Sequence, residues 1–205
     1  MQQQTTGIRF SETIAGGMMH GESDYRRGEQ MARVAGHILA IHVQASIDDL
    51  ERFLVEPQHY GQLEGTIDYP PFGNGLASTA GRFNLFSPTE QPNTKLMIYE
   101  LGFEHGGEPF YLVGHKEVRD DPGFDMWSDT TTLYTRLLRG GDTSGEIIAA
   151  GILTLGMAGL MSLLSSMEVT GADSTMQKID TLTRFGRFFL GELWDSYAGI
   201  GGRRE

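Results

Sequence analysis

The sequence predicts a mainly β protein: an antiparallel barrel of about eight strands, with short helices and an amphipathic helix at the C-terminus. Three observations predict this fold. Apolar and polar residues alternate in several short segments, turn-forming residues separate these segments, and 28 of the 205 residues are glycine. So many glycines suit a strongly curved sheet with many turns.

Alternation is clearest in the middle of the chain. Over residues 95–103 one face carries Met97, Tyr99, Leu101 and Phe103. Gly106 and Gly107 then fit a tight hairpin, and the returning segment 109–119 places Phe110, Leu112 and Lys116 on one face. Further strands are expected over residues 8–18, 31–43, 63–69, 81–86 and 130–138, with one more beginning near residue 147. Such a lipocalin-like sheet can enclose a small ligand.

Residues 147–164 carry no charge, and about 18 apolar residues is the lower limit for a membrane span. Interrupting glycines and the lack of basic flanks favour a buried strand followed by a short helix. Residues 35–55 and 149–169 align without gaps. The second half of residues 35–55 has the spacing of an amphipathic helix, with Ile47, Leu50 and Leu54 on its apolar face. Ser46 is a natural N-cap for this helix. A strand running into a helix is therefore expected in both.

The C-terminal segment has helical spacing over residues 174–197. Its apolar face includes Ile179, Leu182, Phe185, Phe189 and Leu193. Ser174 and Gln177 fit a capping box. We therefore expect a barrel domain over residues 1–172, a helix over 173–198 packed on it or docking a partner, and a mobile tail over 199–205.

Composition excludes several functions. The formal net charge is −11, from 16 basic and 27 acidic residues, which argues against a nucleic-acid groove. No cysteine is present, so disulfides and thiolate chemistry are excluded. No phosphate-binding glycine loop, GxSxG elbow or HExxH motif occurs, and the six histidines show no metal-ligand spacing. We expect no cofactor and no metal. No export signal is seen, which favours the cytoplasm; the oligomeric state stays open.

The densest polar segment, residues 115–132, holds most of the candidate site residues. Lys116 shares its strand face with Phe110 and Leu112. Inside the barrel it would bind a ligand oxygen or pair with a buried aspartate, and outside it would be a solvated lysine. The aspartates and threonines either contribute to a site or form local turns. The expected ligand-binding residues are Lys116, Asp125, Trp127, Asp129, Tyr99 and Phe110.

Residues 112–134, LVGHKEVRDDPGFDMWSDTTTLY, resemble a segment of the multidomain proteins that carry a GMC-type sterol oxidoreductase module. The resemblance extends to FSETIAGG, LEGTIDYPPFG and GRFNLF, and covers most of the chain to about residue 170. It implies an accessory region of these cholesterol oxidase-like proteins. The flavin-binding fingerprint is missing, so the resemblance carries over an association with sterol or lipid chemistry and no oxidase activity.

Three functional hypotheses follow. The first is a non-catalytic module that binds a sterol, fatty acid or similar lipid, with a GMC oxidoreductase as its partner. The second is a cofactor-free isomerase or cyclase inside the barrel. Its candidates are Lys116 with the carboxylate of Asp129, and Tyr134 or Tyr99 as acid. The third is an interaction domain that docks through the aromatic C-terminal helix.

Overall fold

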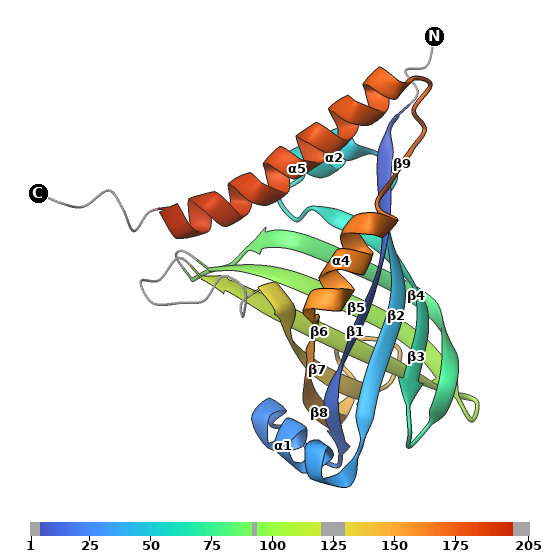
Figure 1. The fold of residues 1–205 in the computed structure, drawn as a ribbon. Helices are drawn as coiled ribbons and strands as arrows, with labels where there is room; N and C mark the ends of the chain where they lie inside the picture. The colour runs from blue at the N-terminus through green and yellow to red at the C-terminus, as the bar shows by residue number, and fades with distance from the viewer. Residues whose placement is uncertain (1–4, 92–93, 120–129, 199–205) are drawn as a thin grey trace, which may run out of the picture.

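The computed structural model describes residues 5–91, 94–119 and 130–198. It is a closed antiparallel barrel of eight strands with a short ninth strand at one end (Figure 1). The strands are β1 (Gly7–His20), β2 (Ile38–Ile47), β3 (Tyr60–Tyr69), β4 (Gly73–Pro88), β5 (Thr94–His105), β6 (Glu108–Arg119), β7 (Thr132–Arg139), β8 (Glu146–Thr154) and β9 (Glu168–Thr170). The predicted fold class is confirmed.

Sequential neighbours pair from β2 through β8, and β1 closes the barrel by pairing with both β2 and β8. The β5–β6 hairpin turns at Gly106 and Gly107, whose φ angles of 61° and 81° lie in the left-handed region. Glycine reaches that region without steric cost, so the turn is as predicted.

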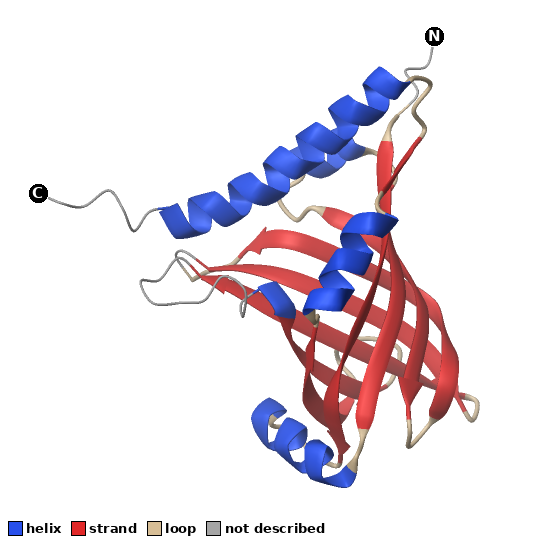
Figure 2. Ribbon diagram, viewed as in Figure 1, coloured by secondary structure: helices blue, strands red, loops and turns tan. Residues whose placement is uncertain are grey.

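Four helices accompany the barrel in the described part of the chain: α1 (Tyr25–Ala35), α2 (Leu50–Val55), α4 (Met157–Ser166) and α5 (Thr175–Ala198). Figure 2 shows α1 at one end of the barrel, α2 and α5 at the other, and α4 against the wall between them. None of these helices is long and apolar enough to cross a bilayer. The expected strand followed by a short helix after residue 147 is confirmed as β8 and α4.

The expected strand over residues 31–43 is wrong in its first part. Residues 31–35 belong to α1, and β2 begins at Ile38. The local chemistry explains the helix. The Asp24 carboxylate accepts a hydrogen bond from the Arg27 backbone N–H at 2.8 Å, and Gly36 ends the helix with φ 71°.

The N-cap expected at Ser46 is also wrong. Ser46 and Ile47 belong to β2, which pairs with both β1 and β3 over this stretch. The helix starts later, at Leu50, and Asp49 caps it by accepting a hydrogen bond from the Arg52 backbone N–H at 3.0 Å. Sheet pairing on both sides therefore prolongs the strand beyond the point that the amphipathic pattern indicated.

An aromatic cluster fills the barrel end at which β3 turns into β4 and β5 into β6. Phe72 packs on Phe110 with ring centres 4.8 Å apart, and Phe103 stacks on Phe110 at 5.6 Å. Tyr69 donates a hydrogen bond to the Met18 carbonyl at 3.3 Å. This end of the lumen is therefore filled with side chains.

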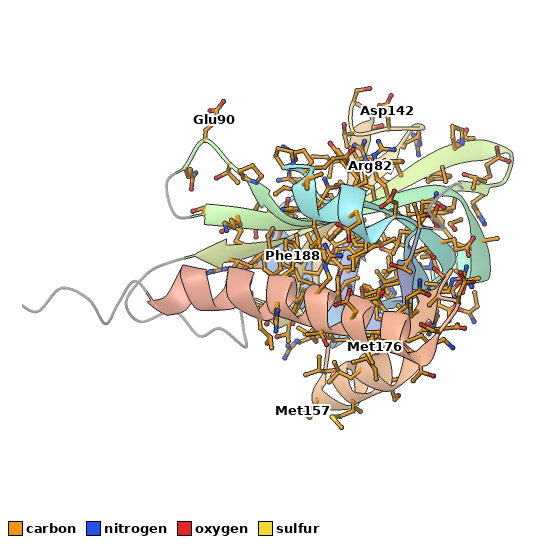
Figure 3. All side chains as sticks on the ribbon, turned by 90° about the horizontal axis from the view of Figure 1, so that it is seen from above. Arg82, Glu90, Asp142, Met157, Met176 and Phe188 are labelled. Carbon is orange, nitrogen blue, oxygen red and sulfur yellow. The ribbon has the colours of Figure 1, made fainter. Side chains whose placement is uncertain are left out.

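Helix α5 lies across the opposite end, as Figure 3 shows from above. Phe185 packs against Phe10, and Phe188 packs against Phe53 and Phe86. Arg184 forms a two-pronged ion pair with Glu51 at the start of α2. At its N-terminus the Ser174 hydroxyl accepts from the Gln177 backbone N–H at 3.2 Å, which confirms the serine half of the expected capping box. The Gln177 side chain accepts from the Asp173 N–H at 2.6 Å and not from that of Ser174. The predicted tail over 199–205 lies outside the described residues.

Candidate functional site

On one side of β1 the strand pairing is interrupted, and the candidate site lies beside this interruption. Residues 15–20 of β1 pair with β8, and residues 7–9 pair with β9. Between them, within the described chain, residues 10–14 pair only with β2, and α4 lies in the place of a strand. The Ser166 hydroxyl accepts a hydrogen bond from the Ser11 N–H at 2.9 Å, and its single proton is shared between the Leu163 carbonyl at 2.8 Å and the Ser11 carbonyl at 3.2 Å. One serine of α4 thus satisfies the strand backbone at this gap.

A cavity of about 620 Å³ lies behind α4 and beneath α5, in the open end of the barrel. Most of its lining is aliphatic, aromatic or methionine side chains. Its lining residues are Phe10, Glu12, Leu85, Met97, Tyr99, Lys116, Thr130, Thr131, Leu155, Leu160, Leu163, Leu164, Met167, Leu182, Phe185, Gly186, Phe189 and Leu190. The cavity is therefore an apolar chamber with few polar groups.

Three of those polar groups line the cavity from three strands: Tyr99 on β5, Lys116 on the adjacent β6, and Glu12 on β1, which pairs with neither of them. Their exposed fractions are 3%, 7% and 2%. Lys116 Nζ donates to the Tyr99 hydroxyl at 3.4 Å and lies 4.8 Å from the centre of the Tyr99 ring. Neither carboxylate oxygen of Glu12 has a partner in strict hydrogen-bond geometry among the described residues, although the Tyr99 hydroxyl is close enough to interact with this carboxylate. We call Glu12, Tyr99 and Lys116 the polar group of the cavity.

Burial dominates the proton equilibria of this group. It lowers the pKa of Lys116 below its usual value, and the negative charge of Glu12 opposes that shift. Burial raises the pKa of Tyr99 well above 10.0, and the Glu12 charge acts in the same direction. Tyr99 is therefore a neutral phenol at neutral pH, able both to donate and to accept a hydrogen bond.

The cavity opens to solvent through an apolar rim between α4 and α5. Leu164, Leu182 and Leu190 line the cavity and are nevertheless 55%, 39% and 66% exposed. Exposed leucines that continue into an internal apolar chamber give an apolar molecule a continuous path inward.

The structure brings together some of the predicted site residues and separates others. Lys116 faces the interior, so the solvated alternative for it is wrong, and Tyr99 lies beside it. Phe110 is buried, but in the aromatic cluster at the far end of the barrel and not in the cavity. Tyr134 points outward, where it stacks on His115 at 5.6 Å and meets Tyr25. Its role as an acid inside the barrel is wrong.

Asp125, Trp127 and Asp129 lie outside the described residues. Thr130 and Thr131, at the end of the same polar segment, line the cavity. The segment therefore contributes to the site at its C-terminal end.

Sequence reasoning missed Glu12. The signal that reveals it is the alternation in β1, where Ile8, Phe10 and Ile14 point into the lumen and Glu12 occupies the same face. A carboxylate in such a row is either an error of register or a functional group.

A second polar arrangement lies on the outer wall of the barrel. His42 Nδ1 lies 3.1 Å from the Thr13 hydroxyl, and His42 Nε2 lies 3.2 Å from an Asp68 carboxylate oxygen. These residues sit within the β1–β2–β3 ladders, where backbone N–H groups bond to adjacent strands. No three described His, Asp or Glu side chains are arranged to hold a metal ion.

The fold and the cavity together define a class: a closed antiparallel β-barrel with a mostly apolar cavity at one end, covered by helices. No protein-family model, curated protein or solved structure matches the chain. Its function must therefore be argued from the cavity itself.

Proposed function

We propose that the protein is a non-catalytic binding module that holds one apolar small molecule, such as a sterol, a fatty acid or a similar lipid, in the cavity beneath α5. The observation that carries the proposal is the cavity itself: about 620 Å³ of mostly apolar lining with a few convergent polar side chains. Binding sites for small molecules range from about 300 to about 1,000 Å³ and have this composition.

The apolar rim supports the same function. An apolar ligand gains roughly 25 cal/mol for each Å² of its surface that leaves water, so a chamber lined by leucine, phenylalanine and methionine favours it strongly. The resemblance of residues 112–134 to proteins with a GMC-type sterol oxidoreductase module suggests a role for such a module: the barrel would hold a substrate or product of that enzyme.

Native mass spectrometry of the purified full chain, followed by solvent extraction, tests the proposal. We expect a stoichiometric apolar molecule, or, for protein stripped of lipid, saturable one-to-one binding of the neutral fluorescent probe N-phenyl-1-naphthylamine. A bare mass combined with no saturable probe binding would remove the proposed function.

A cofactor-free enzyme is the second candidate, and the polar group is the observation that favours it. Glu12, Tyr99 and Lys116 are buried titratable side chains beside an apolar chamber, an arrangement found in acid–base sites. Mass analysis of an identified ligand before and after incubation separates the two functions. Recovery of the unchanged molecule is expected of the binding module, and conversion to an isomer would identify an enzyme.

Docking through the aromatic face of the C-terminal helix has less support. Phe185, Phe188 and Phe189 pack on the barrel. Among the α5 side chains up to residue 191, whose burial is described, the exposed large apolar ones are Met176, Ile179, Leu182 and Leu190. Two of these four belong to the cavity rim, so the binding module accounts for them as well.

A further inference from the structure

The unpartnered carboxylate of Glu12 indicates which chemical group a ligand presents to the cavity. Both oxygens of Glu12 are buried, and neither accepts a hydrogen bond from the described residues. Buried polar groups in proteins are almost always hydrogen-bonded, because an unpaired one costs about 1–3 kcal/mol, and more if it is charged. The described residues therefore leave the Glu12 carboxylate with room for a donor from a ligand.

Lys116 determines what kind of donor fits. Its ammonium group lies in the same cavity as Glu12 and already donates to the Tyr99 hydroxyl. One buried negative charge and one buried positive charge compensate each other across the chamber. A ligand carboxylate would add a second negative charge beside Glu12, and a ligand ammonium a second positive charge beside Lys116. Either would disturb that balance in a region of low dielectric.

We propose that the bound molecule carries a neutral hydroxyl at its buried end, which donates a hydrogen bond to Glu12 and accepts one from Lys116 or Tyr99. The ligand class is thus an apolar alcohol, in preference to a fatty acid or an amine. This inference rests on the proposed function, because it assumes that the cavity holds an apolar molecule.

Competition among ligands with one chain length tests it. Dodecanol, dodecanoate and dodecylamine are each titrated at neutral pH against the full chain loaded with N-phenyl-1-naphthylamine. We expect dodecanol to displace the probe with an affinity at least about tenfold higher than either charged analogue, a difference of about 1.4 kcal/mol.

The outcomes separate the two claims. If dodecanoate or dodecylamine binds as tightly as dodecanol while the probe binds saturably, the inference is overturned and the proposed function stands. If neither the probe nor any of the three ligands binds, the proposed function itself fails.

A pair of isosteric variants localises the selectivity. Glu12→Gln removes the charge and keeps the volume, so we expect the preference for dodecanol over dodecanoate to fall about tenfold or more. Glu100→Gln is the matched control. Glu100 is also a buried carboxylate, 4% exposed, but Arg82 pairs with it and it does not line the cavity. Unaltered selectivity in Glu12→Gln, or an equal change in Glu100→Gln, would contradict the assignment.

Discussion

Two side chains of opposite charge are buried in one apolar chamber, where removing a charge from water is costly. Glu12 and Lys116 are 3% and 2% exposed, and the attraction between them offsets part of the cost of removing each from water. Stability and ligand selectivity therefore depend on the same two residues.

A double-mutant cycle measures that dependence. Lys116→Met leaves Glu12 without its counter-charge, and Glu12→Gln does the reverse to Lys116. We expect each single variant to lower the free energy of unfolding by about 2–4 kcal/mol, and the double variant by clearly less than their sum. Urea denaturation at neutral pH provides the values. Losses that add within about 0.5 kcal/mol would show that the two charges do not interact.

Tyr69 gives a prediction for alkaline pH. Burial raises its pKa from 10.0 to about 12, and its hydroxyl donates to the Met18 carbonyl. Between these two pH values the unfolded chain loses this proton and the folded chain keeps it. Stability from Tyr69 is thus fully present below pH 10 and is lost as the pH rises toward 12, by about 2–3 kcal/mol in total.

The variant Tyr69→Phe cannot ionise there, so its stability should fall less steeply over this range than that of the unaltered chain. Urea denaturation at several alkaline pH values measures the difference, and the other tyrosines contribute equally to both proteins. Equal slopes for the two proteins would contradict the raised pKa.

Among the elements, α4 has the least usual position, because it stands where the β1–β8 ladder is interrupted. Ser166→Ala would remove the hydroxyl that bonds both the N–H and the carbonyl of Ser11. We expect a loss of about 1–3 kcal/mol in the free energy of unfolding, measured by thermal or urea denaturation.

Ser165→Ala is the control for that variant. The Ser165 hydroxyl bonds only within its own helix in the described structure, to the Ser162 carbonyl, and is exposed. It should cost less than about 0.5 kcal/mol. Similar losses for Ser165→Ala and Ser166→Ala would mean that the contact with Ser11 does not hold α4 in place.

Predictability from the sequence differed between elements for physical reasons. The β5–β6 hairpin was predictable, because alternating residues and a glycine pair each specify it locally. Helix α1 was missed because Met31 and Val34 read as strand residues, although both are exposed in the helix. The decisive signals were its ends, Asp24 and Gly36.

The site was only partly predictable, because its residues come from distant segments. Lys116 and Tyr99 were found through alternation on their own strands. Glu12 can be recognised as a site residue only when the closed barrel brings β1, β5 and β6 around one chamber. The interruption of strand pairing beside β1 in turn depends on where β8 ends. Such relations follow from the three-dimensional closure of the barrel, which no local pattern encodes.

At the scale of the whole molecule, the two ends of the barrel differ. Aromatic side chains fill the end around Phe72 and Phe110, whereas the other end keeps a chamber beneath α4 and α5. The central claim of the account is that this chamber is a binding site. Two glycines of α5 allow a direct test, because a Cβ atom added at Gly186 or Gly191 would meet no atom within 4 Å.

Gly186 lines the cavity and Gly191 does not, so Gly186→Phe fills the chamber and Gly191→Phe is its matched control on the same helix. The decisive measurement is the affinity of both variants for N-phenyl-1-naphthylamine. The account predicts at least about a tenfold loss in Gly186→Phe, about 1.4 kcal/mol, with the control unchanged and both proteins folded. Undiminished binding by Gly186→Phe would contradict the claim that apolar ligands occupy this chamber.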